Sequence, residues 1–418
     1  MPVAVAILRA MDDRDALAGL DEVPWGELEH AYGSAEDVPG QLRALRSPAS
    51  GERGQALNEL YGNIFHQGSR YEASAYAVPF LARLACEPGT PQRDEIVLLL
   101  CGLAIGYDDT LLPEGLNVAA WRAEVEKACA TSPAEALREL DRWVEAAEDR
   151  GERGVREFQR SIYDHEQTIR CMRAELAAYD AVRAELPRLR PLLTADDPRL
   201  RAATAYLLGW FPEEAAASLA ALEEMAASET VPAVLANAFV SAGLLSGTSL
   251  IPRLREGLDH PDPLSRWGAA VALARLGQDD PRVVAVLTAA LVDLPPNAPK
   301  EVHFLDGDTR SHAALTLARL SGRLSPQAVD AVLDSMERSS LPLTNEMIQA
   351  TCRLVFPDGP LRPLPPFPEL TGQQQRLVRF LADRDPESWR WYSFVQILRA
   401  WNLPDGRTGC RAYAGLPS

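Results

Sequence analysis

Apolar residues recur at helical spacing along most of the chain, and no stretch alternates polar with β-branched apolar residues as a half-buried strand would. The clearest run has the three-and-four spacing of a coiled-coil seam, and comprises Val155, Phe158, Ile162, His165, Ile169, Met172, Leu176 and Tyr179. A shorter run precedes it, at Leu137, Leu140, Val144 and Ala147. Glycines in residues 148–154, EDRGERG, supply a turn between the two runs. We therefore expect an antiparallel helical hairpin over residues 131–185.

The second half of the chain contains an internal repeat. Residues 186–210 match residues 251–275 at a constant offset of 65, with ten of the 25 positions identical. The offset corresponds to two units of about 33 residues, and residues 218–245 make up the unit between the two copies. Periods of this size are typical of stacked helix pairs, because each pair buries its apolar face only against its neighbours.

The shared positions have physical roles in such a stack. Pro187 and Pro252 mark helix starts, since the N–H that proline lacks would have no partner in the first turn. Asp197 and Asp262 stand where the next helix begins, and a carboxylate is stabilised by the positive end of a helix. We expect each of them to pair with the arginine four residues later. The small residues that follow allow close helix packing.

The D-P-x-x-R-x-x-A-x-x-A-L core at 262–273 resembles the HEAT repeat of bacterial armadillo-like, phycobilisome-lyase-type proteins. A weaker copy stands at 197–208, the matching helix starts lie at 78–84 and 251–258, and fainter copies lie at 51–64, 308–322 and 345–356. The resemblance implies an all-α fold, a HEAT-like α-solenoid of stacked helix pairs with the helical hairpin inserted. Such proteins mostly bind other macromolecules through a groove, although the family also includes enzymes.

This organisation predicts five segments. They are N-terminal HEAT-like repeats at 1–130, the hairpin at 131–185, HEAT repeats at 186–356, a connector at 357–370 and a helical cap at 371–418. The connector follows from six prolines within residues 356–370, which cannot continue a helix. The last segment is expected to cover the end of the core with its aromatic residues, because a terminal repeat has no neighbour: Trp389, Trp391, Tyr392, Phe394 and Trp401.

The net charge of the chain limits the classes of molecule that it is expected to bind. Its 418 residues include 42 basic and 59 acidic side chains, a net charge of −17, and residues 1–130 hold 20 acidic against 10 basic side chains. Such a chain repels phosphate backbones and acidic membranes, so we expect a basic protein or peptide partner and no nucleic acid. The first residues, MPVAVAILRAMDDRD, resemble neither a signal peptide nor an anchor, and no later stretch is apolar enough to span a membrane, so we expect a cytoplasmic protein.

Residues 65–72, FHQGSRYE, have two interpretations. As a corner between helices, Gly68 ends one helix, Ser69 with Glu72 caps the next, and His66 lies in a last turn. As a binding site, the corner presents its polar side chains to a groove. The residues concerned are His66, Gln67, Arg70 and Tyr71.

Two further stretches are candidates for chemistry. Residues 301–312 contain His303, Asp306, Asp308 and His312, four side chains able to ligate a divalent metal, although Asp308 also suits a helix N-cap. In residues 106–115, GYDDTLLPEG, Asp108 and Asp109 are a candidate acid and base, against the simpler role of solvated surface residues.

Recognised catalytic signatures are lacking. The sequence has no phosphate-binding glycine-rich loop and no nucleophile elbow. The six cysteines form no C-x-x-C pair, so we expect free thiols, no zinc site and no cofactor. A HEAT enzyme that hydroxylates a modified lysine uses several His-Glu pairs, whereas the His-Glu dipeptide of this chain is His165-Glu166 alone.

Three functions remain open from the sequence. The first is a non-catalytic scaffold that binds a protein or peptide through its groove. The second is an immunity or inhibitor protein that neutralises a basic toxin, since an acidic surface speeds capture of such a partner. The third is an enzyme of unmarked type with a site near His66 or His303. The sequence leaves the oligomeric state and the binding face open.

Overall fold

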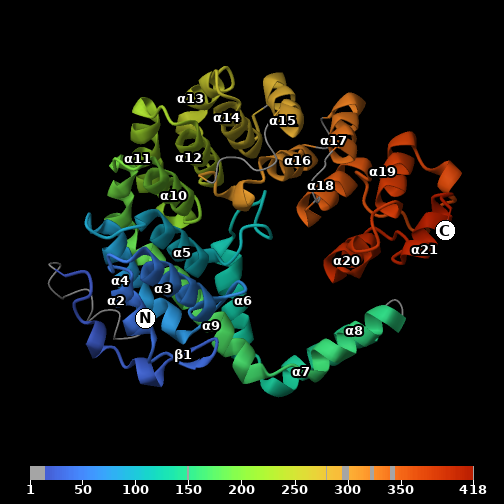
Figure 1. Cartoon of the computed structure of the whole chain (residues 1–418). Helices are drawn as coiled ribbons and strands as arrows, with labels where there is room; N and C mark the ends of the chain where they lie inside the picture. The colour runs from blue at the N-terminus through green and yellow to red at the C-terminus, as the bar shows by residue number, and fades with distance from the viewer. Residues whose placement is uncertain are drawn as a thin grey trace. The chain divides into compact units, whose positions relative to one another are not determined.

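The structure is a computed structural model, and it describes residues 15–147, 150–278, 280–293, 301–320, 324–338 and 344–417. Within these residues the chain is helical almost throughout (Figure 1). The regular exceptions in this part of the chain are two antiparallel hairpins of two-residue strands: β1 (Glu29–His30) with β2 (Gly33–Ser34), and β3 (Phe65–His66) with β4 (Ser69–Arg70). The all-α solenoid-like architecture predicted from the sequence is confirmed. No described helix has the length and apolar character that a membrane span requires.

The chain divides into two compact units. Unit 1 comprises the chain up to Tyr107 together with Leu116–Leu192, and unit 2 comprises Asp108–Gly115 together with the chain from Leu193 onward. The division cuts across the predicted segments, because the short loop 108–115 packs with unit 2 although the helices on both sides of it belong to unit 1.

Unit 1 is built around two helices that pack along each other, α4 (Glu72–Cys86) and α9 (His165–Leu189). α9 buries Ala174, Ala178 and Val182, whose spacing of four places them on one face. The other helices of this unit are η1 (Leu20–Glu22), η2 (Trp25–Glu27), α2 (Val38–Ala44), α3 (Ser50–Asn63), α5 (Arg93–Ile105), α6 (Val118–Ala130), α7 (Pro133–Glu145) and α8 (Arg150–Ser161).

The inserted hairpin exists but is shorter than predicted. α7 and α8 form it, with Arg156 over the Trp143 ring at 4.9 Å and Arg160 Nε 2.8 Å from Asp141 Oδ1. The seam expected to run without a break from residue 155 to 179 is interrupted, because α8 ends at Ser161 and a new helix begins at His165. Phe158 and Ile162 are each 63% exposed. The second half of the predicted seam is instead the core helix α9.

Unit 2 is a stack of helices in two rows (Figure 1). The inner row consists of α10 (Pro198–Leu208), α12 (Pro232–Leu244), α14 (Pro263–Arg275), α16 (Thr309–Arg319) and α18 (Asn345–Val355). The outer row consists of α11 (Ala215–Ser228), α13 (Ile251–Gly257), α15 (Pro281–Asp293) and α17 (Pro326–Arg338). Three α-helices follow in the described residues, α19 (Gly372–Ala382), α20 (Tyr392–Ala400) and α21 (Arg407–Tyr413), together with the short 3-10 helices η8 (Phe367–Glu369) and η9 (Ser388–Arg390).

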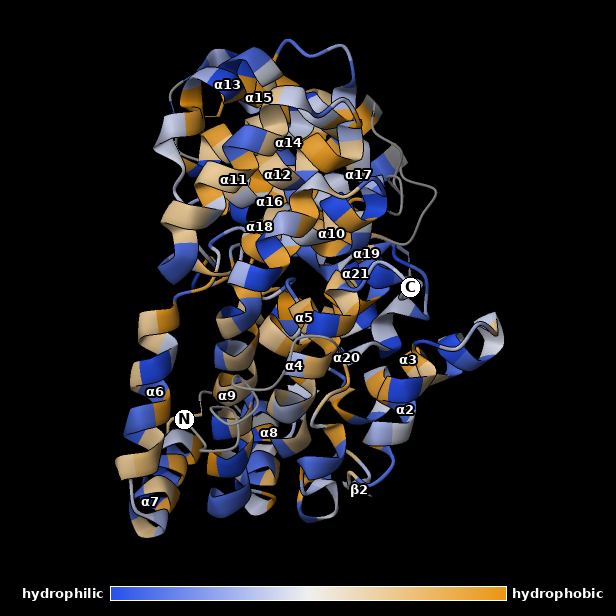
Figure 2. Ribbon diagram, turned by 90° about the vertical axis from the view of Figure 1, so that its left-hand side faces the viewer, coloured by the Kyte–Doolittle hydropathy of each residue, from blue (hydrophilic) through white to orange (hydrophobic). Residues whose placement is uncertain are grey.

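The inner row packs closely because its residues are small and apolar. Many apolar residues, drawn orange, lie between polar residues, drawn blue, among the helices of this stack in Figure 2. A Cβ added to Gly268 would lie 2.8 Å from the Ala236 Cα, and one added to Gly243 would lie 2.7 Å from the Ala272 Cα. These two helices therefore touch backbone to backbone, which only glycine permits. The predicted close approach of helices through small residues is thus confirmed for this pair.

The arginines of the repeat have other partners than the expected aspartates among the described residues: Arg266 contacts loop carbonyls, and Arg201 forms an ion pair with Glu229, Nε to Oε2 at 2.7 Å. Asp262 caps α14 by accepting the Leu264 N–H at 2.8 Å, whereas Arg266 Nη1 donates to the carbonyl oxygens of His260 and Pro261, both at 2.8 Å. Arg201 makes the same contacts with Ala195 O at 2.7 Å and Asp196 O at 3.0 Å. The carbonyls of the preceding loop outcompete the carboxylate, because the carboxylate already serves the helix N-terminus.

The same contact occurs in unit 1, where the sequence repeat is faint. Arg53 Nη1 donates to Ser47 O at 2.8 Å and to Pro48 O at 3.0 Å, again five and six residues earlier. α3 therefore starts in the same way as α10 and α14, although no Asp-Pro precedes it.

Candidate functional site

Residues 65–72 form a β-hairpin between α3 and α4 instead of a plain helix corner. Its two turn residues, Gln67 and Gly68, have φ of 50° and 85°, in the left-handed region that glycine adopts without strain. The expectation that Gly68 ends a helix and that Ser69 caps the next one is wrong, because Ser69 lies in β4. The start of α4 is instead fixed by Ser74 in its first turn. The Ser74 Oγ accepts the Tyr71 N–H at 2.8 Å and donates to Ile64 O at 2.6 Å.

His66 lies in β3 and not in a last helical turn, and its imidazole has a defined tautomer. Nδ1 lies 3.0 Å from the Gly62 carbonyl oxygen, and a carbonyl only accepts, so Nδ1 carries the proton. The ring lies edge-on to Tyr32, with centroids 5.4 Å apart. In the neutral ring Nε2 is then a hydrogen-bond acceptor at the partly exposed tip of the hairpin.

Two exposed tyrosines adjoin this hairpin. Tyr32 is 72% exposed and lies against His66, and Tyr107 is 55% exposed and packs edge-on to Phe65. An added Cβ on Gly68 would lie 3.1 Å from Tyr107 Cδ2, so the turn itself touches that ring. We call Tyr32, His66, Gln67, Gly68 and Tyr107 the hairpin surface. Sequence pattern could not place the two tyrosines here, because Tyr32 precedes the hairpin by 33 residues and Tyr107 follows it by 37.

The other two predicted site residues do not belong to this surface. Arg70 is 6% exposed and forms an ion pair with Glu175 of α9 at 3.4 Å. Burial lowers the pKa of Arg70 and raises the pKa of Glu175. Tyr71 is half-buried at the start of α4, and desolvation raises its pKa. Arg70 is therefore a structural residue that fixes β4 to α9.

The structure brings the other two sequence candidates together in unit 2. Asp108 Oδ2 accepts hydrogen bonds from the Tyr206 hydroxyl at 3.1 Å and from the Leu305 N–H at 3.0 Å. His303 lies beside the same tyrosine, with ring centroids 5.6 Å apart. Leu305 and Asp306 have φ of 52° and 51°, which strains non-glycine backbone. Sequence spacing alone could not show that residues 108 and 305 meet.

The titratable groups of this cluster have displaced pKa values. Burial raises the pKa of Asp108 to about 7, with smaller contributions from the charges of Asp306 and Asp109. Burial lowers the pKa of His303 to about 4 and that of His312 to about 3. Burial is the first cause of all three pKa shifts, and each shift favours the neutral form of its side chain, as expected of titratable groups removed from water.

The titratable groups of this cluster are buried. Asp108 is 8% exposed and His312 is 1% exposed, so neither side chain is open to a substrate from solvent. Asp308 has a structural role instead of that of a metal ligand, because its carboxylate caps α16 by accepting the Ser311 N–H at 3.0 Å. Among the residues that the structure describes, no three His, Cys, Asp or Glu side chains are grouped to hold a metal. The geometry favours a structural role for these groups.

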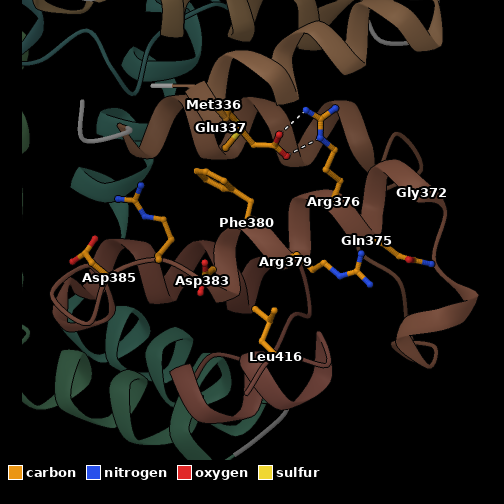
Figure 3. Close-up of a pocket in the computed structure, with 11 residues that line it drawn as sticks. Met336, Glu337, Gly372, Gln375, Arg376, Arg379, Phe380, Asp383, Asp385 and Leu416 are labelled. Atoms are coloured by element: carbon orange, nitrogen blue, oxygen red, sulfur yellow. Dashed lines mark hydrogen bonds and ion pairs between the residues drawn. The ribbon is translucent and has the colours of Figure 1, made fainter. Parts of the chain in front are cut away.

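A cavity of about 740 Å³ lies between α17 and α19 (Figure 3). Figure 3 shows Phe380 directed toward Met336, while Arg379 points to the opposite side. Some of the charged residues around it form ion pairs: Arg376 Nε lies 2.7 Å from Glu337 Oε1, and Asp383 Oδ1 lies 2.7 Å from Arg411 Nη1. Arg379 instead lies over the Phe367 ring at 5.0 Å, and the buried Nε of Arg384 has no hydrogen-bond partner among the described residues.

Comparisons with known proteins do not place the chain in a family. No family model and no curated protein matches it. A solved structure described as an engineered protein aligns over 91% of this chain and 97% of its own, with 16% sequence identity and a TM-score of 0.30.

Proposed function

We propose that the protein is a non-catalytic scaffold of HEAT type that binds another protein or peptide, and that the hairpin surface of unit 1 makes the contact. One observation carries this proposal: two tyrosines, 72% and 55% exposed, gather with His66 and Gln67 on a structured hairpin. Tyrosine is enriched among the residues that dominate binding energies, because it offers a large apolar area and a hydroxyl at small entropic cost.

The surroundings of the hairpin support this proposal. A hollow of about 700 Å³ lies between α4 and α9, and its walls include Leu28, Ala75, Tyr76, Ile169 and Ala174. The first turn of α4 follows the hairpin directly, so an apolar partner side chain could enter this hollow while the partner contacts the hairpin surface. The arginine contact shared by α3, α10 and α14 supports the HEAT assignment, because three helices of the chain begin with it.

The charge of the chain favours a basic partner. Residues 1–130 hold 20 acidic and 10 basic side chains, and 20 − 10 leaves a charge of −10 in that part of the chain. This observation favours a second candidate, an inhibitor of a basic toxin, since opposite charge accelerates encounter. In that case the association rate of the captured partner should fall steeply as salt is added, whereas a neutral scaffold contact should change little.

The test compares two double variants of the full chain. Tyr32→Ala/Tyr107→Ala removes both exposed rings of the hairpin surface. The matched control is Trp391→Ala/Tyr392→Ala, which removes two rings that are 65% and 59% exposed in unit 2. Proteins captured from the native lysate by each variant are identified by cross-linking and mass spectrometry.

We expect the first variant to lose a partner that the wild type and the control both retain. Circular dichroism should show the same helix content in all three proteins. If the hairpin variant keeps every partner, or if both variants lose the same ones, the hairpin surface is not the contact.

A further inference from the structure

The loop 108–115 is held by side chains of unit 2, as a short bound peptide would be. It follows α5 and precedes α6, both of which belong to unit 1, but it packs with unit 2 itself. Three backbone hydrogen bonds fold it into compact turns: the Leu111 and Leu112 N–H groups both donate to Asp108 O at 3.0 Å, and the Gly115 N–H donates to Leu111 O at 2.7 Å. Its conformation therefore relies on its own turns as well as on the surface that holds it.

A carboxylate fixes each end of the loop. At the first end, Asp108 is held by the Tyr206 hydroxyl of α10 and by the Leu305 N–H. At the other end, Glu114 Oε2 lies 3.4 Å from Arg275 Nη1 and 2.7 Å from Arg319 Nη1. Arg275 Nη1 also donates to the Pro113 carbonyl oxygen at 3.2 Å. The inner row of unit 2 thus contacts both acidic ends.

The part of the loop between these ends rests on apolar side chains. Leu112 is 6% exposed and Pro113 is buried. An added Cβ on Gly115 would lie 3.2 Å from Leu244 Cδ2, so the chain passes directly over α12. The floor beneath Pro113 comes from three successive inner helices at a spacing of about four, namely Val240 and Leu244 of α12, Val271 of α14, and His312 and Thr316 of α16.

Two arginines, Arg275 and Arg319, lie at one end of this floor, and the loop does not neutralise both of their charges. Among the described residues, the ion pairs of Arg275 and Arg319 both go to Glu114. Burial lowers the pKa of Arg275, and the charge of Arg319 contributes to the lowering. Two guanidinium groups thus share one carboxylate. The Glu114 side chain is 68% exposed, and an ion pair with so exposed a partner is weak, so another carboxylate can replace it.

We propose that the inner face of α12, α14 and α16 is a binding site for a short acidic peptide segment of a partner protein, and that loop 108–115 is its intramolecular occupant. The peptide class is read from the loop: a turn-forming segment with apolar residues and proline before a glutamate. This site lies in unit 2, does not rest on the hairpin surface, and takes a ligand of opposite charge to the basic partner expected there. The loop competes with the peptide, because a tethered ligand has a high effective concentration.

The experiment measures binding of a fluorescent peptide to the full chain by fluorescence polarisation. The probe is N-acetylated and C-amidated YDDTLLPEG, the sequence of residues 107–115. The site is opened with Leu112→Ser/Glu114→Gln, which weakens the apolar and ionic contacts of the resident loop. The single variant Glu114→Gln is measured in parallel, since that side chain is 68% exposed and its replacement leaves the apolar contacts of the loop in place.

We expect the opened variant to bind the probe at least about tenfold more tightly than the wild type, and Glu114→Gln to lie between them. Adding Arg319→Gln to the opened variant, or replacing Glu by Gln in the probe, should each reduce affinity at least about tenfold, because each removes the ionic contact. Two results would overturn the proposal: no saturable binding by Glu114→Gln and the opened variant, or equal binding of a scrambled probe of the same composition.

Discussion

Two serines near the start of α4 were candidates for capping it. Ser69 precedes the helix and Ser74 lies in its first turn, and the S-x-x-E pattern of Ser69 and Glu72 favoured Ser69. The structure assigns this role to Ser74, because it is fully buried and bonded to both Tyr71 N–H and Ile64 O. Local pattern could not distinguish the two, since the hairpin that removes Ser69 from the helix depends on turn geometry.

This difference leads to the first prediction. Ser74→Ala leaves a buried N–H and a buried carbonyl without partners, so it should lower the free energy of unfolding by about 1–3 kcal/mol. Ser69→Ala alters an exposed strand residue and should change it by less than about 0.5 kcal/mol. Urea denaturation followed by circular dichroism measures both. A larger loss for Ser69→Ala would restore the capping interpretation.

Asp108 makes the stability of unit 2 depend on pH. Its pKa rises from the ordinary 3.8 to about 7 in the folded protein because the side chain is buried. The folded state therefore holds a proton that the unfolded state has lost between these two values. The stabilisation is fully present below about pH 4 and is lost as pH rises through about 7. His303 and His312 act in the opposite direction, since burial lowers their pKa values.

The second prediction isolates this carboxyl group. Asp108→Asn keeps a side-chain oxygen for Tyr206 and Leu305 but cannot ionise. Its stability relative to wild type should rise between about pH 4 and 7, by at most about 4 kcal/mol, since each unit of pKa is worth about 1.4 kcal/mol. The histidines cancel in this difference. Thermal unfolding across that pH range tests it, with the exposed Asp109→Asn as control; a flat difference for Asp108→Asn would contradict the prediction.

The aromatic residues that the sequence assigned to one C-terminal cap differ in burial: some are in the core and others are exposed to solvent. Phe394 is 3% exposed and stacks edge-on with Trp389 at 5.1 Å, whereas Trp391 is 65% exposed. The ring centroid of Trp401 lies 5.9 Å from that of Phe356, the residue that follows α18. Composition predicted that aromatic residues gather here, but the turn between Trp389 and α20 decides which of them are buried.

The third prediction separates the two tryptophans. Trp389→Ala removes a ring that packs on Phe394 and should cost about 2–4 kcal/mol, less than a fully buried tryptophan because Trp389 is half-buried. Trp391→Ala should cost less than about 0.5 kcal/mol, since its ring is mostly in solvent. Guanidinium denaturation of the two variants gives both values. Equal losses would show that both rings cover the core.

The repeat units show which local features a sequence pattern can predict. Asp262 was predicted to begin a helix and does so, because an N-cap depends only on residues next to it in the chain. The partner of Arg266 was predicted wrongly, because the loop carbonyls that bind it are fixed by how the preceding helix ends. Arg53 makes the same contact without a recognisable motif.

At the scale of the whole molecule, the division into two units leads to a fourth prediction. Two compact units can unfold separately, so differential scanning calorimetry should resolve two transitions. Ser74→Ala should lower the midpoint of one transition, and Arg266→Met, which removes the contacts to His260 and Pro261, should lower the other. The double variant should show both shifts. If each variant shifts one common transition, the units unfold as a single cooperative body.

The sequence by itself determined the helical fold, the stacking of small apolar helices and the helix starts at Asp197, Pro252 and Asp262, because these depend on residues within a few positions of one another. The helix starts predicted at Pro187 and at 78–84 are wrong: Pro187 and Pro79 lie inside α9 and α4, because those helices already begin at His165 and Glu72. Only the tertiary structure decided the rest. It joined Asp108 to Leu305, placed Tyr32 beside His66 and Tyr107 beside Phe65, and paired the buried Arg70 with Glu175. These contacts join residues far apart in the chain, and packing in three dimensions fixes them.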